Sequence, residues 1–196
     1  MNKNYNENLN YIEAWSVAVN ALSGKKRENL LEDGFVSSAK GYKVCYITEV
    51  ENFTFRGLGF GEYNLSSSSK CEKKIKKCSI TVNLNCDCGF YAFYDQSKAF
   101  NLAENYRGLV PIEVELYGKI IMHKDGMRGE EQDVIRVFLS RICSKGYCNR
   151  EGIYLSKKVS FYNKKKKYLV RCEKHKSNEN FMISEISKDK IDIVRY

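Results

Sequence analysis

Alternating apolar and polar residues predict strands along much of the chain. The clearest case is the segment from Pro111 to Met122, PIEVELYGKIIM, which alternates over most of its length. Successive side chains of a strand point to opposite faces of a sheet, so this pattern predicts a strand with one buried face. Segments rich in β-branched and aromatic residues predict further strands at residues 11–22, 42–50, 53–60, 80–84, 90–94 and 134–139.

One helix is predicted between two of these strands. Asp95 can cap its N-terminus, and Arg107-Gly108 would end it. Its apolar positions are Ala99, Phe100, Leu102, Ala103 and Tyr106. Residues 66–77 are polar and lysine-rich without an apolar period, which predicts a loop, and residues 124–126 predict a turn. The pattern of residues 181–196 does not separate helix from strand.

Length and composition favour a packed, β-rich protein. The chain has 196 residues, of which 43% are hydrophobic, with 14 Tyr, 10 Phe and 1 Pro. A chain of this length and apolar content can form one domain of ordinary size with a small appended module. The first ten residues are polar, and no apolar run approaches the ~20 residues that span a bilayer. We therefore expect a cytoplasmic protein, of bacterial or phage origin, without membrane contact.

The eight cysteines need an explanation other than disulfides, which are rare in reducing compartments. Two short pairs stand near the C-terminus, Cys143-Ser-Lys-Gly-Tyr-Cys148 and Cys172-Glu-Lys-His175. A short pair places two ligands on one turn, and the intervening hairpin, with strands near 154–161 and 168–171, can fold one pair over the other. The spacing predicts a closed zinc site of three sulfurs and one nitrogen.

A second cluster of cysteines predicts a further zinc site. Cys71, Cys78, Cys86 and Cys88 lie within 18 residues, and surrounding lysines would favour their thiolates. The alternative is a lysine-rich surface loop with two incidental cysteines beside a strand end. Cys45, in an apolar strand, is expected to be a core residue. One or two zinc ions are therefore expected as cofactors.

These segments also carry resemblances to known proteins. Cys86-Asp-Cys-Gly-Phe-Tyr-Ala92, preceded by Ala14-Trp15 and followed by Val114–Gly118 and Gly126–Glu130, resembles a family of uncharacterised bacterial and phage proteins over roughly residues 11–140. The resemblance implies one fold unit and a metal site at the Cys-x-Cys segment. Met127 and Gly129 depart from the family pattern of an aromatic and an alanine. The C-terminal ligands resemble small zinc-ribbon tails, in which the ion supports the fold.

The predicted class is a β-rich α+β domain, residues 1–140, with a zinc ribbon or knuckle at residues 141–196.

Charge is distributed unevenly between the two predicted parts. Residues 1–140 hold 18 basic and 18 acidic residues, whereas residues 141–196 hold 15 basic and 6 acidic ones and so carry the whole net charge of +9. A basic module suggests a polyanionic partner. Lysines neutralise phosphates and aromatic rings stack on bases, which predicts weakly sequence-specific nucleic-acid binding through the C-terminal hairpin. The expected contacts are Lys157, Lys158, Lys164, Lys165, Lys166, Lys167, Arg171, Tyr162 and Tyr168.

Three other interpretations remain open. The lysines can be simply solvated, with the protein acting as a protein-binding adaptor in a ribonucleoprotein or a defence or anti-defence complex. The chain can bind a small nucleotide signal, with Arg128 and Arg136 as anchors. An enzyme is the least supported class, because His123 is the one histidine left over from the zinc site and Walker, Gly-x-Ser-x-Gly and His-Glu-x-x-His motifs are absent.

Overall fold

The computed structural model describes residues 38–58, 61–71, 82, 88–159, 165–186 and 191–196. Within these residues the protein is β-rich with one α-helix, and a small C-terminal sheet carries a cluster of three cysteines and one histidine. The predicted class, β-rich with a ribbon- or knuckle-like C-terminus, is confirmed. The strand expected at residues 11–22 and most of the one expected at 80–84 lie outside the described residues.

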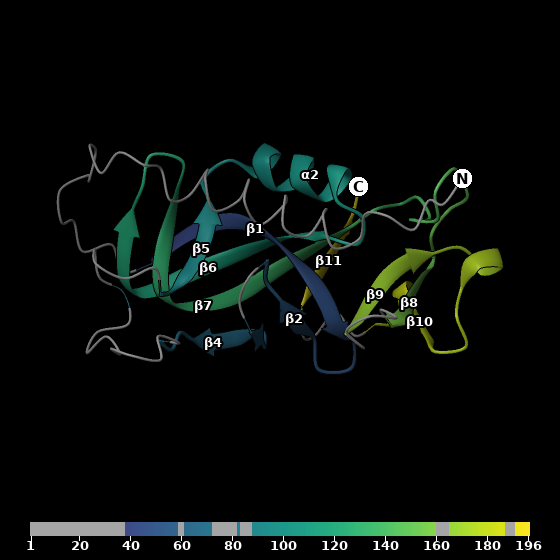
Figure 1. Ribbon diagram of the computed structural model, residues 1–196, viewed down its shortest axis with the longest axis horizontal. Coiled ribbons are helices and arrows are strands. Elements are labelled where there is room, and N and C mark those ends of the chain that lie inside the picture. Colours follow the sequence, from purple (N-terminus) through teal and green to yellow (C-terminus); the bar gives the residue numbers. More distant parts are fainter. Residues whose placement is uncertain (1–37, 59–60, 72–81, 83–87, 160–164, 187–190) are drawn as a thin grey trace.

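The strands form two sheets (Figure 1). The eight-stranded sheet consists of β1 (Ser38–Glu49), β2 (Thr54–Arg56), β3 (Glu62–Tyr63), β4 (Ser66–Ser68), β5 (Phe90–Phe93), β6 (Val110–Met122), β7 (Gly126–Leu139) and β11 (Asp192–Arg195). The three-stranded sheet has the order β10-β8-β9 and consists of β8 (Tyr154–Val159), β9 (Lys166–Arg171) and β10 (Asn180–Met182). Two short 3-10 helices follow strands of this smaller sheet, η1 (Glu173–His175) and η2 (Ile183–Glu185). The smaller sheet lies at the right-hand end of the molecule in Figure 1.

β6 and β7 form the longest strand pairing of the larger sheet. β6 matches the predicted strand, but β7 begins at Gly126, eight residues before the strand expected at 134–139. Residues 126–133 are mostly charged or glycine, so their own pattern gives no strand signal. They are held as a strand because β6 pairs with one edge, and β5 and β4 pair with the other. Part of the loop predicted over residues 66–77 is therefore wrong, since residues 66–68 form β4.

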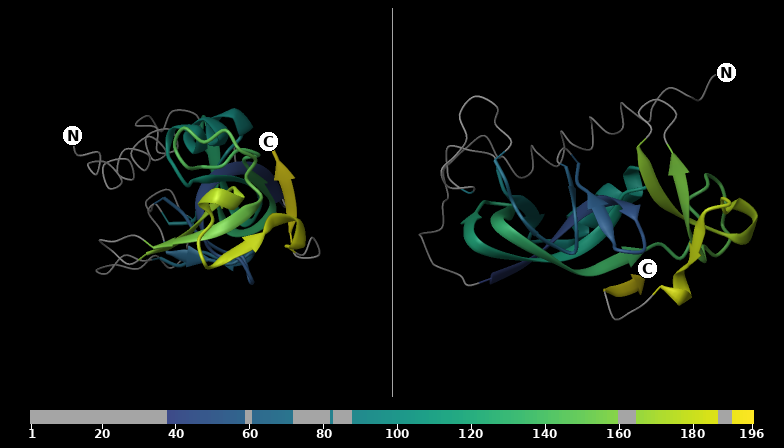
Figure 2. Two further views of the ribbon diagram at one scale, coloured as in Figure 1. Left: turned by 90° about the vertical axis from the view of Figure 1, so that its right-hand side faces the viewer. Right: turned by 90° about the horizontal axis from the view of Figure 1, so that it is seen from below.

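Four strands close into a ring of pairings. β1 pairs with β6, β6 with β7, and β7 with β5, and β5 returns to β1 through Tyr42 opposite Phe93. Gly41 makes this closure possible, because a Cβ at that position would lie 2.7 Å from Met127 Cε and 2.8 Å from the Phe93 carbonyl oxygen. In β6 the register shifts between Tyr117 and Ile120, where Gly118 has a φ of 70°. A bulge of this kind bends the strand and helps the sheet to curl (Figure 2).

The predicted helix is confirmed as α2 (Gln96–Asn105). The Asp95 carboxylate accepts a hydrogen bond of 2.8 Å from the Ser97 backbone N–H, which satisfies one of the free donors at the helix start. Ala99 and Leu102 are buried against Val44 and Phe93 of the larger sheet. In Figure 1, α2 lies above the long strands β6 and β7, whereas β2 and β4 lie below them.

One buried cluster joins the two sheets. It contains Cys45 and Ile47 from β1, Leu155 from β8, and Tyr168 and Val170 from β9. The expected core role of Cys45 is confirmed, because its side chain is fully buried. The C-terminal strand β11 returns to the larger sheet and pairs in parallel with β7. β7 of the larger sheet ends at Leu139 and β8 of the smaller sheet begins at Tyr154, while residues 192–195 return to the larger sheet. The division of the chain at residues 140 and 141 into two domains stays a prediction.

A partly buried lysine, Lys43, lies beside the same core. The Lys43 ammonium group donates to Gln132 Oε1 at 3.1 Å and lies 4.9 Å from the centre of the Tyr63 ring and 5.3 Å from that of Phe90. Burial lowers the pKa of Lys43 to about 8. The amide and the two rings take the place of a carboxylate partner, because a cation is attracted to the face of an aromatic ring.

Candidate metal centre

Three short segments bring the four predicted C-terminal ligands together. Cys143 and Cys148 stand on the loop between β7 and β8, Cys172 directly follows β9, and His175 ends η1. The four ligand atoms all lie within 4.8 Å of one another. The ligand set predicted from the spacing of the pairs is therefore brought to one place by the fold.

The separations match those around a single tetrahedral ion. Cys148 Sγ lies 3.9 Å from Cys172 Sγ, and His175 Nδ1 lies 3.6 Å from Cys143 Sγ and 3.4 Å from Cys172 Sγ. Metal–sulfur bonds of ~2.3 Å and metal–nitrogen bonds of ~2.05 Å at tetrahedral angles give S···S separations of ~3.8 Å and S···N separations of ~3.6 Å. A disulfide would need ~2.05 Å between the sulfurs, and these cysteines are free. The group can hold a metal ion such as zinc.

Backbone hydrogen bonds hold the ligand loop against β9. The Cys143 N–H donates to the Arg150 carbonyl at 3.0 Å, and the Ser144 N–H donates to the Val170 carbonyl at 2.9 Å. A Cβ on Gly152 would collide with Val170 Cγ1, so a glycine is needed where the loop crosses β9. The first ligand pair is thus tied to the strand that leads into the second.

The local electrostatics favour a thiolate at Cys143 and oppose one at Cys148. Burial would raise the pKa of the Cys143 thiol, but hydrogen bonds from the backbone N–H groups of Lys145 and Cys172, together with the His175 and Cys172 side chains, lower it to about 6. The Arg150 backbone N–H favours the Cys148 thiolate, yet burial and the neighbouring sulfurs raise its pKa overall. Adjacent sulfurs resist carrying two negative charges together, and a divalent cation removes this conflict.

The arrangement suits a structural ion. Cys143 and Cys172 are each 3% exposed, while Cys148 and His175 are partly exposed. Four protein ligands fill a tetrahedral shell and leave no position for a substrate or an activated water. An ion held at this site can cross-link the β7–β8 loop to the end of β9, which is a structural role.

The structure describes two of the four cysteines of the second predicted site. Cys71 and Cys88 are partly exposed. Cys78 and Cys86 lie outside the described residues, so the four-cysteine site stays a prediction.

Two of the predicted nucleic-acid contacts serve the core instead. Tyr168 is 5% exposed and its hydroxyl donates to Glu179 at 2.8 Å, so its ring has no free face for a base. Arg171 is 8% exposed, and burial lowers the pKa of its guanidinium. The structure thus places both side chains in buried positions: Tyr168 belongs to the cluster shared by the two sheets, whereas Arg171 lies outside that cluster, beside Cys143.

The remaining predicted contacts have mixed surroundings. Lys157 forms an ion pair of 2.6 Å with Glu179, and the Lys167 ammonium lies 5.2 Å from the centre of the Tyr46 ring. Lys158 is partly exposed, whereas Lys165 and Lys166 are exposed. Tyr162 and Lys164 lie outside the described residues. The exposed part of the predicted basic surface is therefore the far end of the hairpin.

Arg128 and Arg136 lie at different places along β7. Arg128 is 3% exposed and donates to the Cys88 carbonyl at 3.1 Å. Arg136 forms ion pairs with Glu113 at 2.9 Å and Asp192 at 2.6 Å. Their role as anchors for a small nucleotide stays a prediction.

His123 lies at the end of β6 and is half-buried. Burial and the nearby Arg128 lower the pKa of its imidazole, and its Nε2 atom has no hydrogen-bond partner within the described residues. The nearby Asp125 carboxylate pairs with Lys98 at 2.7 Å.

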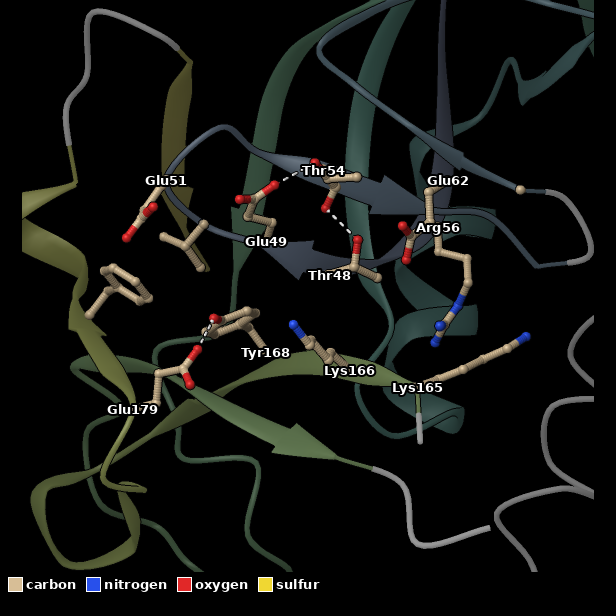
Figure 3. Close-up of a pocket in the computed structure, with 13 residues that line it drawn as sticks. Thr48, Glu49, Glu51, Thr54, Arg56, Glu62, Lys165, Lys166, Tyr168 and Glu179 are labelled. Atoms are coloured by element: carbon tan, nitrogen blue, oxygen red, sulfur yellow. Dashed lines mark hydrogen bonds between the residues drawn. The ribbon is translucent and has the colours of Figure 1, made fainter. Parts of the chain in front are cut away.

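Sequence reasoning missed an open groove of about 870 Å³ between the β1–β2 turn and β9 (Figure 3). Its charged lining comprises Glu49, Glu51, Glu62 and Glu179 with Arg56, Lys165 and Lys166. Figure 3 shows Glu51 and Glu179 at one end, and Arg56 and Lys165 at the other. The residues come from segments more than 100 positions apart, so no local pattern could have signalled the groove. Its mixed charge does not offer a uniform positive field to a polyanion.

A fully exposed aromatic side chain was also missed. Tyr147, between two metal ligands, is 100% exposed and has a φ of 60°. An aromatic residue inside a short ligand pair is a signal that the sequence did contain.

Among the described residues, no helix is both long and apolar enough to cross a membrane. Comparison of the chain with protein-family models, curated proteins and solved structures finds no match. The resemblance to a bacterial and phage family stays a prediction, and the Cys143–Cys148–Cys172–His175 group is the part of the expected pattern that the structure supports.

Proposed function

We propose that this chain is a zinc-stabilised nucleic-acid-binding protein in which one zinc ion braces a small basic module. The observation that supports it most is that the Cys₃His group and the excess of cations belong to the same small module. The described residues between 141 and 182 hold 11 Lys and Arg but only 3 Glu. A surface with this excess attracts a polyanion by displacing its counterions.

Zinc is the proposed ion because three thiolates and one imidazole in tetrahedral order are the donor set of structural zinc sites. The three thiolates and the ion together carry a formal charge of about −1, so the module remains strongly basic when filled. Zinc holds the β7–β8 loop against β9 and thereby fixes the cations of that loop relative to those of the hairpin.

The phosphate contacts are assigned to exposed cations. Lys165 and Lys166 lie at the end of the hairpin, while Lys145, Arg150 and Lys174 lie on the loop and on η1 beside the metal ligands. Lysine acts as a point charge toward phosphate and reads no base edge. The binding is therefore proposed to depend weakly on sequence and strongly on salt.

The test is binding of the zinc-loaded chain to single-stranded DNA, duplex DNA and structured RNA from ~50 to ~200 mM salt, where phosphate contacts show their salt dependence. Changing Lys165 and Lys166 to Gln should weaken binding and reduce the slope of log K against log salt by roughly 1.5 for two lost phosphate contacts. The matched control changes Lys119 and Lys124 to Gln, which are exposed in the β6–β7 hairpin, and should leave the slope unchanged. Absence of binding at the lowest salt, or an equal effect of both double variants, would contradict the proposal.

A further inference from the structure

Tyr147 is exposed in a way that the fold does not require. Its side chain is 100% exposed, compared with 38% for Tyr94 and 38% for Tyr196, and it adds nothing to the buried core. A single exposed apolar side chain is ordinary on a protein surface and by itself marks no site. The exposure of Tyr147 does leave both faces of its ring open to a partner.

The backbone at Tyr147 is strained as well. The Cys148 N–H donates to the Lys145 carbonyl at 2.9 Å, which closes a four-residue turn with Tyr147 in third position. Tyr147 has a φ of 60°, in the left-handed region, where a turn of this kind favours glycine or asparagine. Gly146 stands one position earlier, is not among the residues with positive φ, and has no atom within 4 Å of its ideal Cβ position. A bulky ring thus occupies the position of the turn where a small residue would be less strained.

The metal ligands hold this turn in place. Cys143 and Cys148 flank it on both sides, and the Lys145 backbone N–H donates to the Cys143 sulfur. A strained residue persists when the surrounding structure over-determines its conformation. The turn therefore fixes the backbone from which the ring projects, so little loop entropy is lost when the ring engages a partner.

The charges around the ring select the kind of partner. Lys145 and Arg150 are exposed on the same loop, and Lys174 is exposed on η1 between two of the metal ligands. A flat aromatic ring among cations matches a polymer whose phosphates alternate with flat bases. Bases within a duplex are already stacked on each other, so the ring requires an unpaired strand. Tyr168, one of the two predicted stacking residues, is buried and does not compete for this role.

We propose that Tyr147 stacks on an unpaired base, and that the zinc-held turn is the part of the nucleic-acid surface that contacts bases. This inference rests on the proposed function and adds that the favoured polymer is single-stranded. The cations bind phosphates of any strand, while the ring distinguishes a strand with bases from one without. Stacking tolerates every base, so the preference concerns the presence of bases and not their order.

The experiment compares two strands of equal length, oligothymidylate and a strand of abasic spacers that keeps the phosphates and lacks bases. The zinc-loaded wild-type chain should bind oligothymidylate more tightly, on the order of 5- to 150-fold, as expected for one stacked base. Tyr147→Gly should remove this preference and leave binding of the abasic strand unchanged. Tyr147→Phe should retain the preference, because the ring remains. Tyr94→Asn, an exposed tyrosine far from the ligand loop along the sequence, serves as the control and should retain it too.

Stability provides a second readout. Glycine relieves the left-handed backbone, so Tyr147→Gly should melt at the same temperature as the wild type or higher, with unchanged zinc content. Tyr147→Asn also suits this backbone and replaces the glycine variant if that chain does not fold. Loss of all binding by the wild type to both strands would refute the proposed function. Equal binding of both strands by the wild type, or an unchanged preference in Tyr147→Gly, would refute the role of Tyr147 and leave phosphate binding standing.

Discussion

Cys148 Sγ lies 3.9 Å from Cys172 Sγ, although 24 residues separate them in the chain. The first belongs to the β7–β8 loop and the second directly follows β9. Because β9 also packs into the core shared by both sheets, an ion between these sulfurs connects a surface loop to the main body of the protein.

Loss of one ligand should therefore unfold the C-terminal module. Cys172→Ser removes a thiolate from the centre, and structural zinc binding contributes an apparent ~10–16 kcal/mol to folding in small zinc domains. We expect a lower melting temperature and one fewer zinc ion per chain, measured by calorimetry and metal analysis. Cys45→Ala, which shortens a core cysteine outside the site, should lower the melting temperature modestly and keep the zinc. Unchanged melting and zinc content in Cys172→Ser would contradict the assignment.

Gly146 and Gly152, both in the β7–β8 loop, should respond differently to replacement by alanine. Gly152→Ala places a methyl group against Val170 Cγ1 where the loop crosses β9, so we expect a loss of about 1–3 kcal/mol in the free energy of unfolding and weaker metal retention. Gly146→Ala meets no atom within 4 Å and should cost less than about 0.5 kcal/mol. Denaturant unfolding of both variants checks this difference, and equal effects would show that the loop does not pack on β9 as described.

Lys43 should make stability depend on alkaline pH. Its pKa falls from the ordinary 10.5 to about 8 in the folded protein, so the folded state carries the cost of a buried charge in full below pH 8. As the pH rises from 8 to 10.5, the folded state loses this proton before the unfolded state does, and the cost disappears. The full cost is on the order of 3 kcal/mol.

Replacing Lys43 by Met should therefore stabilise the protein relative to wild type more at pH 7 than at pH 10. The unpaired Gln132 Oε1 left by the substitution costs about 1–3 kcal/mol at every pH and does not alter this trend. Denaturant titrations of both chains at the two pH values measure the difference. A gap between the two chains that is independent of pH would show that Lys43 is solvated.

Local patterns identified the elements whose signals lie within a few residues. The alternation of residues 111–122 predicted β6, and Asp95 followed by an apolar period predicted α2 and its cap. The paired spacing of Cys143 with Cys148 and of Cys172 with His175 predicted a ligand group that the fold brings within 4.8 Å. Metal ligands arrive in short pairs because one turn must aim two side chains at one ion, and spacing records that requirement directly.

Other features depend on residues that are distant in the chain. The charged first half of β7 is a strand because β6, β5 and β4 pair with its edges, and its composition carries no sign of this. Tyr168 is of a residue type that stacks on bases, but it is buried because β9 packs into the core shared by the two sheets.

By itself, then, the sequence determined the β-rich class, the capped helix, the four C-terminal metal ligands and the uneven charge. Each of these depends on neighbours along the chain or on simple counts. Only the tertiary structure decided which aromatic ring is free, which cations are paired, and where the strand ring closes at Gly41. Those outcomes depend on which side chains are buried and by which neighbours. The neighbours come from segments that are distant in the sequence, so a local pattern does not contain them.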